Sequence, residues 1–119
     1  MESLTKAEEK VMQVLWKLGK AFVKDIIEHM DEQPKPPYTT ISSIVRILES
    51  KGFVGYKAYG KTHEYFPVIQ REEYSKRTLR QMITDYFDGS AANVMSFLVR
   101  EEKLGEAEIE ALKKLIEKS

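Results

Sequence analysis

The chain has 119 residues, of which 42% are hydrophobic and 32% charged, a composition typical of one small globular domain with or without a short addition. It contains no cysteine, which excludes disulfides, thiolate metal sites and cysteine nucleophiles. No apolar run approaches the ~20 residues that cross a bilayer, and the charged N-terminus lacks the apolar stretch of a signal peptide, so we expect a cytoplasmic protein without membrane contact.

Basic residues gather in the middle of the chain although the net charge is zero, with 19 Lys and Arg against 19 Asp and Glu. Between residues 35 and 63 there are five basic residues and one acidic residue, a local charge of +4. Because nucleic-acid binding depends on a local basic patch more than on total charge, this distribution permits a DNA-binding segment.

Two helices are predicted before residue 31. Thr5 and Glu8 have the spacing of a reciprocal capping box, and Gly19 is placed to end the first helix. The apolar residues of this helix recur on one face at Ala7, Val11, Val14, Leu15 and Leu18. The second, shorter helix shows the same period at Phe22, Ile26, Ile27 and Met30.

A third helix is predicted after a proline-containing loop at 31–38. Thr39 or Thr40 is expected to cap it, and it is expected to run to Lys51 and stop at Gly52. Its core-facing positions are Ile41, Ile44, Val45 and Leu48.

The next two segments, 53–58 and 62–68, are rich in aromatic and β-branched residues. They predict a two-stranded β-hairpin in which Gly60 supplies the positive φ of the turn. Three short helices followed by a hairpin is the element order of a winged helix-turn-helix. We therefore expect a mainly α protein with a small β-hairpin wing.

Three further amphipathic helices are predicted at 71–88, 91–102 and 106–118. A segment of ~50 residues rarely folds alone, so its apolar faces need a partner, and a second copy of the chain is the simplest one. We expect a DNA-binding domain over 1–69 and a helical dimerisation domain over 70–119; packing of these helices onto the winged helix is the alternative. The expected dimer contacts are Leu79, Met82, Ile83, Tyr86, Phe87, Val94, Leu98, Ile109, Leu112 and Ile116.

The outward face of the third helix carries candidate DNA contacts. At about 100° per residue, Thr39, Ser43 and Arg46 fall opposite the core-facing positions. Short hydroxylated side chains let a helix lie deep in a major groove, and Arg46 suits a bidentate contact with guanine. Thr40, at the helix N-terminus, suits a phosphate. The simpler interpretation of the same face is an ordinary solvated one.

The hairpin and the end of the third helix supply further basic groups. Lys57 and Lys61 flank the tip and His63 follows it, and wings of this kind place basic tips on the sugar-phosphate backbone. The alternative is a solvated hairpin whose lysines discourage edge pairing. Lys51, Lys57 and Lys61 are expected to neutralise phosphates, so that affinity falls as salt rises.

No catalytic or metal-binding pattern is present in the sequence. The two histidines, His29 and His63, have no carboxylate partner at metal spacing on one helix face, and neither a phosphate-binding glycine loop nor a nucleophile elbow occurs. We expect no enzyme activity, no cofactor and no metal. Two other classes stay open: a protein–protein interaction module that uses Ile47, and a small-molecule-sensing regulator whose pocket is lined by Tyr56, Tyr59, Tyr86 and Phe87.

Four stretches of the chain carry motifs in a fixed order. They are residues 4–16 (LTKAEEKVMQVLW), 40–54 (TISSIVRILESKGFV), 59–67 (YGKTHEYFP) and 104–112 (LGEAEIEAL). In this order and spacing they resemble the penicillinase-repressor (BlaI/MecI) family of bacterial transcriptional repressors. The resemblance implies a homodimeric winged-helix repressor that binds a palindromic operator and blocks transcription, often of β-lactam-resistance genes.

The resemblance also implies roles for particular residues. The third helix of the family reads the major groove, which here corresponds to Thr39, Thr40, Ser42, Ser43 and Arg46. A basic residue that many members carry late in this helix falls at Ile47.

The C-terminal helices of the family form the dimer, and an inactivating protease or sensor system acts on that region. Cleavage in the family is common at an Asn-Phe bond, where this chain has Ser96-Phe97. Copper-responsive relatives carry Cys-x-Cys pairs, which this chain lacks, so copper sensing by that chemistry is excluded.

Overall fold

The computed structural model describes residues 3–101 and 105–117, with side chains described up to residue 114. The chain divides into two compact units, Met1–Arg71 and Glu72–Ser119. The boundary predicted from the sequence lies between residues 69 and 70. That the two parts are separate functional domains stays a prediction.

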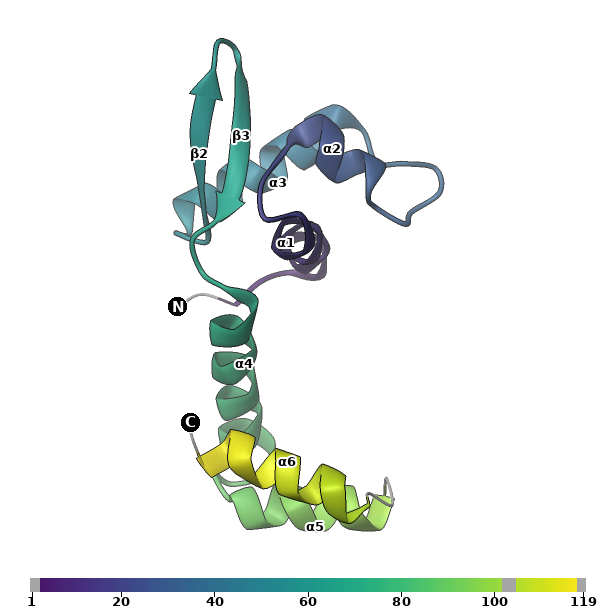
Figure 1. Ribbon diagram of the computed structural model, residues 1–119, viewed down its shortest axis with the longest axis vertical. Helices are drawn as coiled ribbons and strands as arrows, with labels where there is room; N and C mark the ends of the chain where they lie inside the picture. The colour runs from purple at the N-terminus through teal and green to yellow at the C-terminus, as the bar shows by residue number, and fades with distance from the viewer. Residues whose placement is uncertain (1–2, 102–104, 118–119) are drawn as a thin grey trace. The chain divides into compact units, whose positions relative to one another are not determined.

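The first unit is built on three helices, α1 (Lys6–Leu18), α2 (Val23–Glu28) and α3 (Tyr38–Ser50), which surround a single core (Figure 1). The largest side chains that are less than 2% exposed come from α1, α2, α3 and the residue that leads into the sheet: Val11, Met12, Leu15, Ile26, Ile41, Val45, Leu48 and Phe53. Burial of these apolar groups is the main force that fixes α3 against the rest of the unit.

The predicted capping box of α1 is confirmed. The Glu8 N–H donates to Thr5 Oγ1 at 3.2 Å, and the Thr5 N–H donates to Glu8 Oε1 at 2.8 Å. Gly19 ends the helix with φ 85°, a conformation that costs glycine little. These local bonds satisfy N–H groups that the first helical turn leaves unpaired.

The sheet has three antiparallel strands in the order β1-β3-β2: β1 (Ala21–Phe22), β2 (Val54–Tyr59) and β3 (Thr62–Pro67). Tyr59 pairs with Thr62, so the hairpin turn is Gly60-Lys61, with Gly60 at φ 63° as predicted. The hairpin of β2 and β3 extends away from the helices and forms the wing (Figure 1).

Strand β1 corrects the sequence analysis, which assigns Phe22 to the second helix and expects a two-stranded hairpin. Phe22 instead pairs with Glu64 of β3, and its N–H donates to Asp25 Oδ2 at 3.1 Å, at the start of α2. A two-residue strand has too few positions to show a period, and its pairing depends on a segment about 40 residues away.

The start of α3 is a second correction. The helix begins at Tyr38 with Pro37 as its cap residue, and neither Thr39 nor Thr40 makes a capping bond. The Pro37 carbonyl accepts the N–H groups of Thr40 and Ile41, at 3.1 and 3.3 Å. Proline suits this boundary because its φ is fixed and it has no N–H that needs a partner.

The second unit consists of α4 (Arg71–Tyr86, its first residue in the first unit), α5 (Ala91–Glu101) and α6 (Glu106–Glu117). Figure 1 shows α5 and α6 side by side. Among the described side chains of this unit, only Val94 is buried. Over the described ranges, 3–101 and 105–117, we find no helix with the length and apolar character needed to span a membrane.

Candidate nucleic-acid interface

The orientation predicted for α3 is confirmed. Ile41, Val45 and Leu48 are buried, whereas Thr39, Ser43 and Arg46 are exposed on the opposite side. The Ser50 hydroxyl donates to the Arg46 backbone carbonyl at 3.1 Å, and this bond does not involve the Arg46 guanidinium. The outer face of α3 therefore offers hydroxyls and one guanidinium to solvent.

The remaining α3 residues lie at the edges of this face. Thr40 is exposed in the first turn, but its N–H is already used by Pro37, so only its hydroxyl is offered outward. Ser42 and Ile44 are half-buried, and Ile47 is 47% exposed. Ile47 is thus an apolar group beside the polar face, as the sequence analysis expects.

The wing carries its basic and aromatic groups in ordered pairs. The Lys57 ammonium lies 5.3 Å from the centre of the Tyr59 ring, in a cation–π arrangement. The His63 ring stacks on Tyr56 with ring centres 4.2 Å apart and planes 9° from parallel. Lys61 is exposed in the turn. The wing therefore contains Lys57, Lys61 and His63. The Tyr59 ring restrains Lys57, and the Tyr56 ring restrains His63.

Lys51 is placed differently from the expectation that it neutralises DNA phosphate. Its Nζ lies 2.8 Å from Oε1 of Glu8 and 3.3 Å from the Ser3 carbonyl, and its side chain is 19% exposed. Burial by itself raises the pKa of Glu8, but the hydrogen bond and charge of Lys51, together with the Thr5 N–H, outweigh it and hold the pKa below its usual 4.5. Lys51 thus joins the end of α3 to α1.

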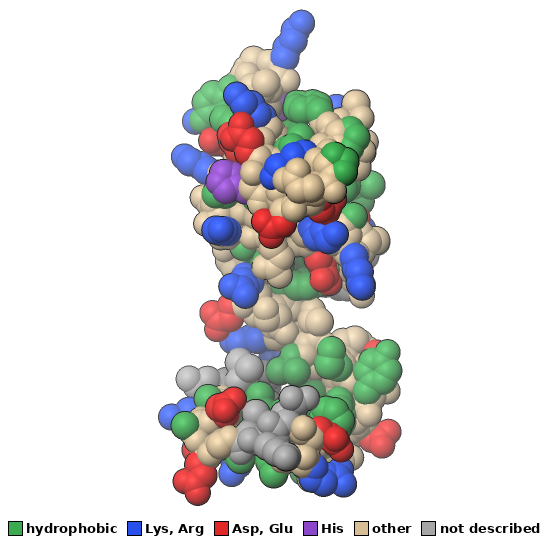
Figure 2. All heavy atoms as spheres, turned by 90° about the vertical axis from the view of Figure 1, so that its right-hand side faces the viewer, with side chains coloured by type: hydrophobic (Ala, Val, Ile, Leu, Met, Phe, Trp, Pro, Cys, Tyr) green, Lys and Arg blue, Asp and Glu red, His purple; other side chains and the backbone are tan. Residues whose placement is uncertain are grey.

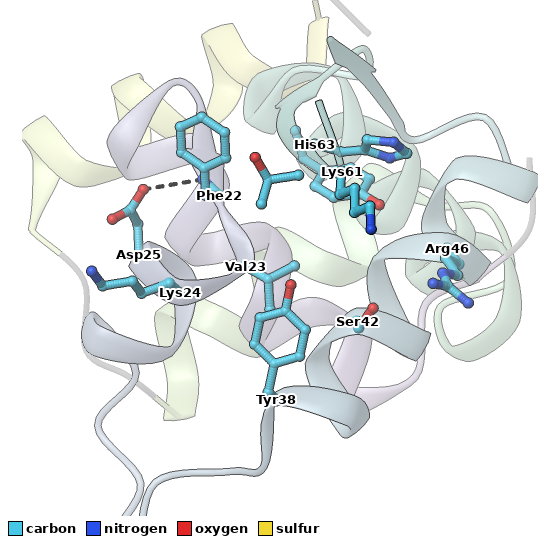
Figure 3. A pocket seen from close by; sticks show the side chains of 11 residues that line it. Phe22, Val23, Lys24, Asp25, Tyr38, Ser42, Arg46, Lys61 and His63 are labelled. Atoms are coloured by element: carbon cyan, nitrogen blue, oxygen red, sulfur yellow. Dashed lines mark hydrogen bonds between the residues drawn. The ribbon is translucent and has the colours of Figure 1, made fainter. Parts of the chain in front are cut away.

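A hollow of about 490 Å³ lies between α2, α3 and the wing (Figure 3). It brings together four of the residues that are predicted to contact DNA: Ser42, Arg46, Lys61 and His63. Its other lining residues are Phe22, Val23, Lys24, Asp25, Tyr38, Thr62 and Tyr65.

Tyr38 is one of several lining residues that sequence reasoning missed, because it falls in the predicted proline loop. It is 56% exposed and begins α3. Its position directly after Pro37 is the one local signal that could have placed it at a helix start. Tyr65, on the inner side of the hollow, is buried, and this burial, with the nearby Glu49 carboxylate, raises the pKa of its phenol above 10.0, so it stays neutral.

The four aromatic residues considered for a ligand pocket are divided between the units. Tyr56 and Tyr59 lie in β2 of the first unit, and Tyr86 and Phe87 lie at the end of α4 in the second. Within the described part of the chain, no group of three or more metal-ligating side chains occurs.

The predicted dimer contacts lie in the second unit, on its helices or, for Phe87, directly after α4, and most of those described are incompletely buried. Met82 and Tyr86 are 47% and 79% exposed, and Val94 is buried within its own unit. Leu79, Ile83, Phe87, Leu98, Ile109 and Leu112 are half-buried. Ile116 lies outside the residues whose side chains are described. Figure 2 shows hydrophobic side chains at the surface of this unit, in the lower half of the view.

Comparison with known proteins adds two findings. A family model described as "Penicillinase repressor" matches residues 4–118. The chain is 26% identical to the "Methicillin resistance regulatory protein MecI" of Staphylococcus aureus (strain N315), over 97% of this chain and 94% of that protein. It is 24% identical to the "Penicillinase repressor" of Bacillus licheniformis, over 96% of this chain and 89% of that protein.

Proposed function

This chain belongs to the penicillinase repressor family, and from that premise we propose that it represses transcription by binding operator DNA as a homodimer. The family consists of regulatory proteins and is not a family of enzymes. The observation that carries the proposal is the exposed face of α3, which offers hydroxyls and a guanidinium beside a basic wing. Such a face can approach base edges closely.

In this proposal α3 enters the major groove. Arg46 donates two hydrogen bonds to a guanine, since its planar guanidinium matches the two acceptors of that base. The hydroxyls of Thr39, Thr40, Ser42 and Ser43 contact base edges or phosphates. Lys57, Lys61 and His63 of the wing contact the sugar-phosphate backbone and position α3 without reading sequence.

The second unit joins two copies of the chain in the same proposal. Its support is that Met82, Tyr86 and Phe97 leave 47%, 79% and 41% of their side chains exposed on short helices. Apolar groups at a self-complementary two-fold interface would be removed from water. A two-fold dimer would place two α3 helices in successive major grooves of a palindromic site and block access to a promoter.

The relatives suggest which genes are controlled. One is named for methicillin resistance and another for penicillinase, and we propose that this protein also acts on antibiotic-resistance genes, in the cytoplasm where the DNA lies. An inactivating protease or sensor partner belongs to the same proposal. It would meet Ser96-Phe97 in α5 and not an Asn-Phe bond.

A protein–protein interaction module is the second candidate function, and the 47% exposure of Ile47 on α3 favours it. Gel retardation of the DNA upstream of the gene, at two salt concentrations, separates the two. Repression predicts a specific complex with two chains per site that weakens steeply as salt rises. Absence of any complex at low salt, with a dimer still present, would favour the interaction module.

A further inference from the structure

The hollow between α2, α3 and the wing brings polar groups of α3 and of the wing into one space (Figure 3). Figure 3 shows the Lys61 side chain and the Tyr38 hydroxyl directed into it, with the Ser42 hydroxyl nearby. An ammonium and two hydroxyls supply the hydrogen-bond donors that an oxyanion needs. Arg46 lies at the rim and adds positive potential.

The charges that line the hollow are arranged unevenly. Among its described lining residues, Asp25 is the only acid, and its Oδ2 accepts the Phe22 N–H at 3.1 Å. Figure 3 shows Lys24 beside Asp25, with its side chain extending away from the hollow. Lys61 supplies positive charge from the wing turn and Arg46 from α3. The Glu49 carboxylate of α3, outside the lining, acts on the same Tyr65 phenol as Arg46 does.

We propose that this hollow binds one phosphate group, with Lys61 as its charge partner and Tyr38 and Ser42 as hydroxyl donors. Its volume of about 490 Å³ exceeds the needs of a bare phosphate ion and leaves room for an attached sugar. The same chemistry recognises a backbone phosphate of DNA and a free phosphate ion. Binding of a DNA phosphate rests on the proposed function, whereas binding of a free phosphate ion does not.

The first arm of the test uses the full chain without DNA. Inorganic phosphate replaces chloride at constant ionic strength while amide resonances are followed by NMR. We expect saturable shifts at residues 38–42 and 60–63, which Lys61→Ala and Tyr38→Phe each weaken by about fivefold or more. Lys24→Ala removes the same charge from a side chain that extends away from the hollow, and it should change the affinity by less than about twofold.

The second arm measures duplex DNA binding by fluorescence anisotropy across a salt series. Lys61→Ala should reduce the slope of log affinity against log salt by about 0.9 for each bound chain, the value for one lost phosphate contact, and so by about 1.8 for the proposed dimer. Lys24→Ala should leave the slope unchanged. Tyr38→Phe should weaken binding by about fivefold, since one hydrogen bond to a charged group is lost. Circular dichroism of each variant confirms its fold.

The outcomes of the two arms separate the sources. Effects in both arms support a hollow that takes phosphate from DNA and in free form. Effects only on DNA assign the backbone phosphate, and effects only in the titration assign a free phosphate. The proposal is overturned, with the proposed function intact, when wild-type protein binds DNA but neither arm responds to Lys61→Ala or Tyr38→Phe. If wild-type protein binds no DNA, the proposed function fails and the titration alone decides the phosphate site.

Discussion

At the residue scale, the candidate interface depends on a few side chains whose roles differ because their surroundings differ. Arg46 projects from the outer face of α3, and Lys51 is held by Glu8 at the end of the same helix. Both are cations on one element, yet only the first has its charged group on the exposed face. Counting basic residues therefore overstates the charge that is available to a phosphate.

Arg46→Ala should cost about 1–3 kcal/mol of operator binding and relax the base preference at one position in each half-site. Arg46→Lys keeps the charge but loses the planar pair of donors, so it should relax the preference almost as much while it preserves the salt dependence. Binding to a library of operator variants measures both effects. Equal weakening on every sequence would instead assign Arg46 to a phosphate.

Glu8→Gln should lower the free energy of unfolding at pH 7 by about 2 kcal/mol, since a buried charge-assisted bond to Lys51 is lost. The folded-state pKa of Glu8 lies below 4.5, so its stabilisation is complete above that value and disappears as pH falls through the folded pKa. The difference between wild type and variant should therefore shrink as pH falls below 4.5.

Urea unfolding followed by Trp16 fluorescence measures this difference at each pH. Glu28→Gln, at an exposed position of α2, is the matched control and should change the stability little. A difference that does not shrink at any pH below 4.5 would contradict the role given to the ionised Glu8.

At the element scale, the two ends of α3 decide where its outer face lies. Pro37 fixes the first turn, and Gly52 turns the chain with φ 82° so that the Phe53 N–H reaches the Leu48 carbonyl at 2.9 Å. Phe53 is fully buried, so this turn connects α3 to the core and to the wing. The position of α3 follows from both ends together.

Gly52→Ala should destabilise the protein by about 1–2 kcal/mol, the cost of a left-handed conformation for a residue with a Cβ. An added Cβ meets nothing within 4 Å, so the cost comes from the backbone and not from a clash. Gly52→Asn should cost less, because asparagine tolerates this conformation better. Thermal unfolding of the three proteins compares them; equal losses for Ala and Asn would show that the backbone conformation is not the cause.

At the scale of the whole molecule, the two units differ in how much apolar surface they bury. The first unit has a core of fully buried side chains, whereas the described part of the second buries only Val94. The chain has no net charge, so association of two copies meets no overall electrostatic repulsion. These properties fit the proposed dimer.

Met82→Glu should shift the dimer towards monomer, because it places a charge among apolar side chains that a partner would cover. Thr84→Glu adds the same charge at an exposed position of α4 outside the apolar stripe and should leave the dimer intact. Light scattering after size-exclusion chromatography gives the mass of each. A monomeric wild type, or a dimer that Met82→Glu leaves unchanged, would contradict the proposed interface.

Most of the local structure was predictable from the sequence because local chemistry decides it. Thr5 and Glu8 are three residues apart, Gly19, Gly52 and Gly60 stand where a positive φ is required, and the apolar period of α3 defines its outer face. None of these features needs a distant partner. The candidate contacts on that face were therefore found as residues, although their roles stay predictions.

The tertiary structure decided what depends on residues far apart in the chain. Strand β1 exists through its pairing with β3, and the Lys51 ammonium is bound by Glu8, which is 43 residues earlier. Tyr38 and Lys61 line one hollow that no single element forms. A periodic pattern indicates which side of an element faces the core, but it does not indicate which other element packs against that side. The sequence alone therefore determined the helices and the outer face of α3, and only the packing decided which basic side chains are exposed and which are paired with an acid.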